Sequence, residues 1–121
     1  MSNDRQMDDM VFKIKADFLK ALSHPIRLQI IEYLKSGDAS VGKIVKALGV
    51  EQSNLSRHLA TLRELGILHA RQEKTTVYYS INDHDVFKVL RPIAVILRKR
   101  FKKSEKLLEG LGKEGQTRAK E

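Results

Sequence analysis

A run of hydrogen-bonding side chains lies near the middle of the 121-residue chain. Six of the seven residues at positions 52–58 belong to it: Gln52, Ser53, Asn54, Ser56, Arg57 and His58. Asn and Gln can each form two hydrogen bonds with an adenine edge, Arg can do the same with guanine, and Ser can bond a base or a phosphate. Because the same residue types occur on ordinary solvated helix faces, the neighbouring elements must decide between the two interpretations.

The apolar spacing predicts that this run lies on the outer face of a helix. Leucines recur at helical intervals, at Leu55, Leu59 and Leu62. With the leucines turned inward, the polar residues between them face largely outward. Arg57 is then the strongest candidate for a base contact, followed by Gln52 and Asn54, whereas the two serines suit phosphate. His58 lies beside this surface, where it either contacts phosphate or is a half-buried helix residue.

A short helix and a glycine before the run complete a helix-turn-helix pattern. Ser40 can cap a helix over residues 41–48, and Gly49 can end it in a left-handed conformation. The next helix then crosses steeply, and its polar N-terminal half can enter a major groove of DNA. The predicted DNA contacts include Ser40 and Lys43 at the start of the first helix.

The segment after this pattern predicts a β-hairpin. Residues 67–73 and 75–81 are rich in β-branched and aromatic residues with polar residues between them. Polar and basic side chains stand near the tip: Arg71, Gln72, Lys74 and Thr75. Such a hairpin can serve as a wing that reaches a phosphate or a minor groove. An ordinary solvated turn is the alternative.

Composition limits the class of protein. The chain has 23 basic and 15 acidic residues, a formal net charge of +8, 41% hydrophobic residues and no cysteine. This length suits one domain, and the absence of cysteine excludes a disulfide scaffold and thiolate metal ligands. The positive charge lies in two blocks, net +3 over residues 40–81 and net +5 over residues 98–121. We interpret the second block as a solubilising helix end, with extra DNA affinity as the alternative.

The outer parts of the chain predict two further helices that need a partner. Broad apolar stripes at helical spacing run over residues 8–22 and 86–101, with a further helix starting at Pro25 between the first stripe and the helix-turn-helix. One small core cannot cover both stripes, so we expect a homodimer. The predicted fold is therefore mainly α with a small β-hairpin, in the order four helices, two strands and a long helix.

The expected domain organisation follows from these elements. We expect a flexible N-terminus over residues 1–9, a DNA-binding and dimerisation domain over 10–103, and a frayed helix end with a disordered basic tail over 104–121. No apolar run approaches the roughly 20 residues that span a membrane. We therefore expect a cytoplasmic protein without a membrane partner.

Four segments resemble the ArsR/SmtB family in family order and spacing. They are residues 21–28, 53–59, 62–68 and 77–81. The resemblance implies a dimeric winged-helix bacterial transcriptional repressor that binds double-stranded DNA and is joined through its first and last helices. It also implies an inverted-repeat operator and release by an effector, whose identity the residues do not indicate.

The family's two metal sites do not match this sequence. The Cys-x-Cys positions of one site hold Ser40 and Gly42, and the second pair of the other site falls on Ile96 and Lys99. None of these residues can complete a zinc site. We therefore predict no metal and no cofactor. Two alternatives stay open, namely a metal-responsive repressor with a different site, around His84 and its two neighbouring aspartates, and a winged-helix module for protein contacts.

Several residues depart from the family pattern. Glu51 stands where a capping serine is common, so the reading helix either starts at Ser53 or uses the Glu charge on its dipole. Lys74 replaces a glycine at the wing tip, which indicates a different turn. Asp83 is interpreted as the N-cap of the last helix. Pro92 indicates a kink, a break or a new start in that helix. No arrangement typical of an enzyme is present, so we expect no catalysis.

Overall fold

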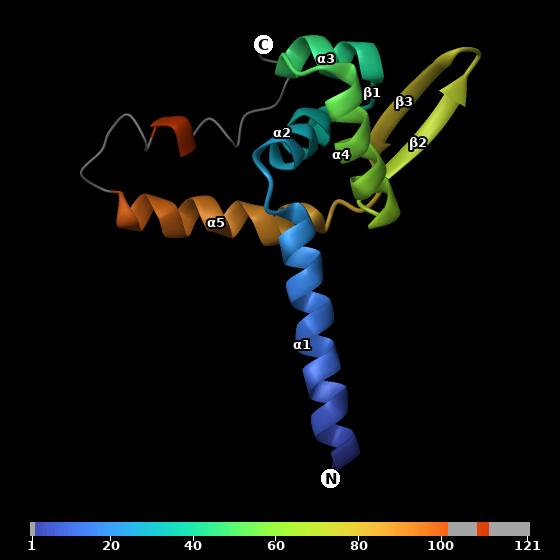
Figure 1. The fold of residues 1–121 in the computed structure, drawn as a ribbon. Helices are drawn as coiled ribbons and strands as arrows, with labels where there is room; N and C mark the ends of the chain where they lie inside the picture. The colour runs from blue at the N-terminus through green and yellow to red at the C-terminus, as the bar shows by residue number, and fades with distance from the viewer. Residues whose placement is uncertain (1, 102–108, 112–121) are drawn as a thin grey trace.

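The computed structural model describes residues 2–101 and 109–111, and it shows a helical body with two projecting helices (Figure 1). The elements in chain order are α1 (Ser2–Leu22), α2 (Pro25–Tyr33), a 3-10 turn η1 (Leu34–Ser36), β1 (Ala39–Ser40), α3 (Val41–Leu48), α4 (Gln52–Glu64), β2 (Leu68–Glu73), β3 (Thr76–Ile81) and α5 (Val86–Arg100). The order confirms the predicted fold class. Residues 109–111 are helical, and the rest of the predicted tail lies outside the described residues.

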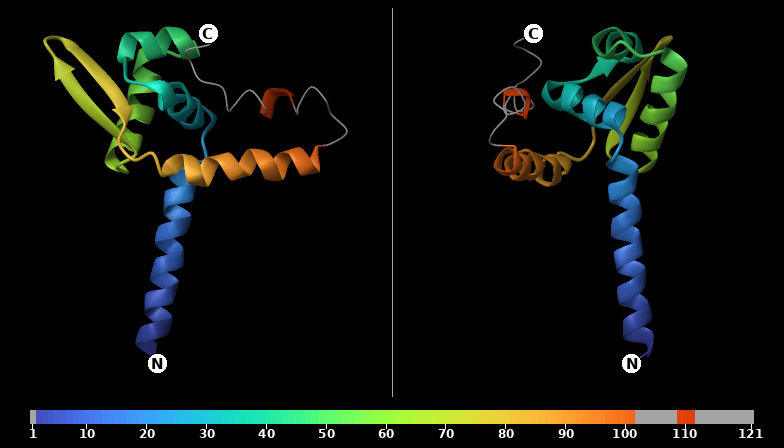
Figure 2. Two further views of the ribbon diagram at one scale, coloured as in Figure 1. Left: turned by 180° about the vertical axis from the view of Figure 1, so that it is seen from behind. Right: turned by 60° about the vertical axis from the view of Figure 1, so that its left-hand side comes forward.

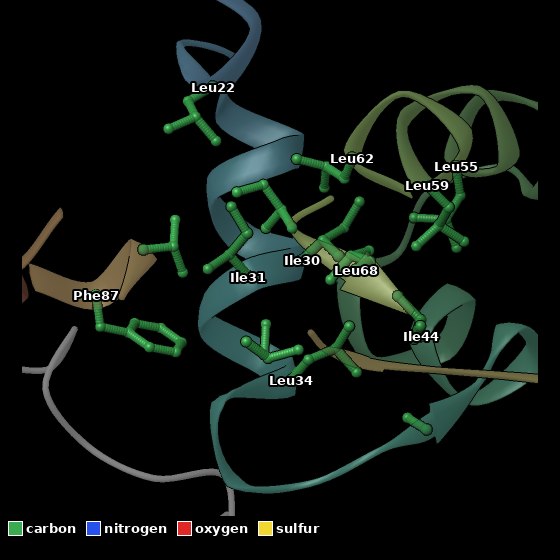
Figure 3. Close-up of a cluster of buried hydrophobic side chains, with 14 residues drawn as sticks. Leu22, Ile30, Ile31, Leu34, Ile44, Leu55, Leu59, Leu62, Leu68 and Phe87 are labelled. Atoms are coloured by element: carbon green, nitrogen blue, oxygen red, sulfur yellow. The ribbon is translucent and has the colours of Figure 1, made fainter. Parts of the chain in front are cut away.

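One hydrophobic core joins α2, α3, α4 and the sheet (Figure 3). Its largest fully buried side chains are Ile30, Ile31, Leu34, Ile44, Leu55, Leu59 and Leu62. The last three form the predicted leucine stripe of α4. Burying a Leu or Ile side chain of this kind contributes about 1.5–3 kcal/mol, so the core fixes how α4 sits on α2 and α3.

The sheet has three antiparallel strands in the order β1-β3-β2. The hairpin of β2 and β3 is as predicted, with Leu68 opposite Ile81 and Glu73 opposite Thr76. It extends beyond the helices (Figures 1 and 2). Strand β1 was not predicted, because two residues are too few to show an alternating pattern. It pairs Ala39 with Tyr79 and so attaches the start of α3 to the sheet.

The first helix of the helix-turn-helix begins and ends on the predicted residues. Ser40 Oγ accepts a hydrogen bond from Lys43 N at 3.2 Å and caps α3. Gly49 ends α3 with φ of 68°, a conformation that favours glycine. Glu51 occupies the N-cap position of α4 without a side-chain hydrogen bond. The helix therefore starts at Gln52, and the carboxylate of Glu51 acts on it only through its charge.

One prediction for the last helix is wrong, and two of the three alternatives for Pro92 are excluded. Asp83 is not its N-cap, because Asp85 holds that position and Asp83 Oδ1 instead accepts a hydrogen bond from Asp85 N at 2.9 Å. Pro92 neither breaks nor starts the helix, since α5 runs through it. Proline has no N–H for the carbonyl four residues earlier, so α5 contains one unmade hydrogen bond that its other contacts must offset.

The outer helices leave large apolar side chains exposed. On α1 these are Met7, Met10, Val11, Phe12, Ile14 and Leu19, and on α5 they are Val89, Ile93, Val95 and Ile96. Helix α1 begins at Ser2, earlier than the predicted start at Asp8. Within residues 2–101 and 109–111, no helix combines the length and the apolar character needed to cross a membrane.

The hairpin turn stores backbone strain that a substitution can remove. Lys74 has φ of 57°, which costs a non-glycine residue about 1–2 kcal/mol, while glycine adds about 0.5–1 kcal/mol of backbone entropy loss. We therefore expect Lys74→Gly to raise the free energy of unfolding by up to about 1 kcal/mol in denaturant titration. Thr75→Gly is the control, because φ of Thr75 is not positive, and it should lower that free energy. A Lys74→Gly variant less stable than the unsubstituted protein would contradict this account.

Candidate nucleic-acid interface

The outward face of α4 carries most of the predicted contact residues. Gln52, Ser53, Ser56 and Arg57 are exposed, and Asn54 is half-buried. Arg57 Nη2 donates a hydrogen bond to Asn54 Oδ1 at 3.2 Å, so the two strongest donors of this face are held side by side. The bond orients both groups, and it leaves the other Arg57 nitrogens and the Asn54 amide nitrogen able to donate.

The start of α3 adds two predicted residues with different roles. The hydroxyl oxygen of Ser40 is occupied by its capping bond, and the residue is half-buried. Lys43 is exposed in the first turn of α3. Its ammonium can reach a phosphate, whereas Ser40 contributes mainly by fixing the direction of the helix.

On the wing, Arg71 is held by neighbouring side chains, whereas the residues at the tip are exposed. Arg71 donates from Nη1 to Asp38 and from Nε to Glu73, both at 3.1 Å, and it lies over the ring of Tyr78 with Cζ 5.0 Å from the centroid. The hydrogen bond to Asp38 raises the pKa of Arg71, and Glu73 adds to this. Two carboxylates therefore offset the charge of Arg71, while Lys74 and Thr75 at the tip are exposed.

His58 is the predicted contact residue whose placement differs. Its side chain is 8% exposed and lies against the core instead of the outward face. His58 Nδ1 accepts a hydrogen bond from Arg27 Nε at 3.1 Å, and its ring centroid is 4.2 Å from that of His24. Of the two predicted roles of His58, its placement fits the buried helix residue, because the 3.6-residue period turns it toward α2 beside Leu55 and Leu59.

The residues around His58 join the end of α1 to the reading helix. Arg27 Nη1 donates to the carbonyl of Ala21 at the end of α1, and His24 Nδ1 caps α2 by accepting from Ile26 N. Sequence reasoning assigned no role to Arg27, because its partner lies 31 positions away along the chain. The partner of Arg71 at Asp38 was missed for the same reason.

The described residues contain no group of three or more His, Asp or Glu side chains that could hold a metal ion. His84 lies with its ring centroid 6.0 Å from that of Phe87, and Asp85 pairs with Lys88 at 3.1 Å. The alternative metal site around His84 is therefore not assembled within the described part of one chain.

A helix-turn-helix packed on a small antiparallel sheet, with a hairpin projecting beside its second helix, defines a winged helix-turn-helix DNA-binding protein. The family model described as bacterial regulatory protein, arsR family, matches residues 24–70. The uncharacterised HTH-type transcriptional regulator Rv0081 of Mycobacterium tuberculosis is 36% identical over 102 residues, which cover 84% of this chain and 90% of that protein. The chain belongs to the ArsR family and is a DNA-binding transcriptional regulator.

Solved structures agree with this assignment. The crystal structure of Rv0081 matches with a TM-score of 0.70 over 77% of this chain and 94% of that chain. The transcriptional repressor BigR from Xylella fastidiosa is 30% identical, with a TM-score of 0.64 over 77% of this chain and 94% of that chain. A homodimeric winged helix-turn-helix DNA-binding domain from Mycobacterium bovis is 28% identical, with a TM-score of 0.67 over 81% of this chain and 91% of that chain.

The buried His58 makes stability depend on pH. Desolvation lowers the pKa of His58, and the nearby His24, Arg27 and Arg57 lower it further. The folded protein therefore resists protonation at a pH where the unfolded chain, with an ordinary His pKa of about 6.5, already binds a proton. We expect the His58 contribution to be complete above about pH 6.5 and to be lost as the pH falls through the lower folded pKa.

Denaturant titrations between about pH 8 and about pH 5 measure this effect. His58→Asn keeps an acceptor for Arg27 but cannot titrate, so its stability should fall less over this range than that of the unsubstituted protein. Equal pH dependence in the two proteins would contradict a contribution from His58.

Proposed function

We propose that the protein is a cytoplasmic homodimeric repressor that binds an operator with imperfect inverted-repeat symmetry. The observation that carries this proposal is the exposed polar face of α4 on a helix-turn-helix frame, with the wing beside it. Each α4 enters one major groove, and the wings flank the site. The proposed contacts are Gln52, Ser53, Asn54, Ser56, Arg57, Lys43, Lys74 and Thr75, with Ser40 and Arg71 next to them.

Within this set, base contacts and phosphate contacts differ in kind. Arg57 and Asn54 offer paired donors to base edges, so they contribute to sequence preference. Lys43 and Lys74 offer single charges to phosphates and contribute affinity without sequence preference. Arg71 is already bonded to two carboxylates, so it positions the wing more than it adds charge.

The proposed dimer follows from the apolar surfaces of α1 and α5. A monomer with this many large apolar side chains exposed on two helices presents a surface that is typical of an interface. The homodimeric domain from Mycobacterium bovis supports the same arrangement. A two-fold axis would also place two copies of α4 on successive major grooves.

The proposed effector does not use the usual metal positions of the family. Ser40 is engaged in capping, and Ile96 and Lys99 are an apolar side chain and a cation. Repression is supported by the similarity to BigR, which is described as a transcriptional repressor. A reporter gene under the upstream promoter tests whether the protein represses or activates, since deletion of a repressor should raise expression.

Loss of the central guanidinium should weaken specific DNA binding. We expect Arg57→Ala to reduce affinity for the upstream intergenic DNA by about 1–3 kcal/mol and to reduce the preference over random DNA. Arg63→Ala removes the same charge from the last turn of α4 and serves as the matched control. Fluorescence anisotropy at several salt concentrations measures both effects. Binding without salt dependence, or without preference for the upstream DNA, would instead favour a module for protein contacts.

A charge placed on α5 should break the proposed dimer without unfolding the protomer. Ile93 is 45% exposed, so Ile93→Glu leaves the core intact but puts a carboxylate into the apolar interface. We expect sedimentation to show a monomer and operator affinity to fall steeply. Leu28→Glu is the control, because Leu28 is an exposed apolar residue on α2 and belongs to neither of the two outer helices. If Ile93→Glu sediments as a dimer, as the control Leu28→Glu should, the proposed interface is contradicted.

A further inference from the structure

A basic hollow lies between the start of α2 and the outer side of α4. Its volume is about 430 Å³, and its lining is His24, Arg27, Asn54, Arg57, His58, Ala60 and Thr61. Two guanidinium groups and two imidazoles therefore share one site. None of the ion pairs among the described residues involves Arg27 or Arg57.

The hydrogen bonds inside this hollow leave mainly donors for a ligand. His24 Nδ1 and His58 Nδ1 both act as acceptors, so each neutral ring carries its proton on Nε2. Arg27 uses Nε for His58 and one hydrogen of Nη1 for Ala21, which leaves the second Nη1 hydrogen and both Nη2 hydrogens. Asn54 Oδ1 already accepts from Arg57, so its amide nitrogen is the group that remains.

A site rich in donors and without a carboxylate matches an anion. Charge-assisted hydrogen bonds to an oxyanion are stronger than neutral ones, and arginine fits phosphate oxygens in pairs. Because the hollow borders the outward face of α4, the nearest anion in the working complex is the DNA backbone. Arg57 contributes charge from the α4 side, where it also belongs to the reading face.

We propose that this hollow binds a phosphate group, held by Arg27 and His24, with His58 as the residue that positions Arg27. The phosphate has two possible sources, a backbone phosphate of the operator and a free phosphate or phosphorylated small molecule. If the phosphate comes from the operator backbone, this proposal rests on the proposed function. If it comes from a free phosphate or a phosphorylated small molecule, it does not.

Binding at this site is linked to protonation. The hollow holds no counter-charge for His58, and the charged groups that face it are His24 at the start of α2, Arg27 on α2 and Arg57 on α4. Protonation of His58 would place a proton on Nδ1 and remove the acceptor that orients Arg27, so the neutral imidazole is the form that supports binding. Phosphate affinity should consequently decrease as the pH falls through the pKa of His58.

The first experiment uses inorganic phosphate and the full-length protein, without DNA. In buffer free of phosphate, we expect added phosphate to shift the ring signals of His24 and His58 in NMR spectra with saturation. Arg27→Gln should abolish this response. Arg27→Lys keeps the charge and should retain part of it, which separates phosphate binding from a purely structural role. Arg63→Gln is the matched control and should leave the response unchanged.

The second experiment identifies the source. If a backbone phosphate fills the hollow, Arg27→Gln lowers the salt slope of operator binding by about 1 per protomer, Arg63→Gln lowers it less, and free phosphate competes with DNA. If free phosphate binds without competing and the slope is unchanged, the hollow is a separate anion site and the proposal holds with that source. Phosphate binding in a protein that fails to bind its upstream DNA would refute the proposed function alone. Absence of a saturable histidine shift, together with equal salt slopes for Arg27→Gln and Arg63→Gln, overturns the proposal.

Discussion

The burial of the three leucines of α4 is the constraint on which the reading surface depends. Leu55, Leu59 and Leu62 are fully buried against α2 and α3, and a rotation of α4 about its axis would expose them. With this face fixed, the helical period decides which polar residues point outward. The same period brings His58 inward, where it bonds Arg27. The packing of these three leucines therefore produces both the exposed reading face and the basic hollow at its edge.

The parts of the fold that repeat a local pattern could be predicted from the sequence. The leucine stripe, the Ser40 cap and the alternation of the hairpin each need only a few neighbouring residues. Strand β1 could not be predicted, because its two residues form a strand only by pairing with β3. The long α5 was predicted from its apolar stripe, but the effect of Pro92 on it could not be, since proline lowers helix stability locally while the packing of the whole helix decides the outcome.

The candidate site likewise has a part that local sequence patterns predict and a part that they do not. The exposed residues of α4 and the wing tip follow from spacing and residue type. The bonds of Arg27 to His58 and of Arg71 to Asp38 join residues more than thirty positions apart. Such pairs depend on how the helices and strands pack in three dimensions. A local sequence pattern does not contain this information. His58 illustrates the difficulty, because its position on the helix was correct while its partner determined its role.

The exposed helix α1 has a consequence for how the regulator responds to its own amount. Isolated helices are marginally stable in water, and most of α1 has no core to pack against within one protomer. In the proposed dimer, folding of this helix is therefore completed by assembly, so protein concentration controls how much binding-competent species exists. Operator occupancy then rises with roughly the square of protein concentration at low abundance, as mass action requires for a dimer. A gene controlled in this way switches over a narrower range of regulator concentration than it would under a monomer.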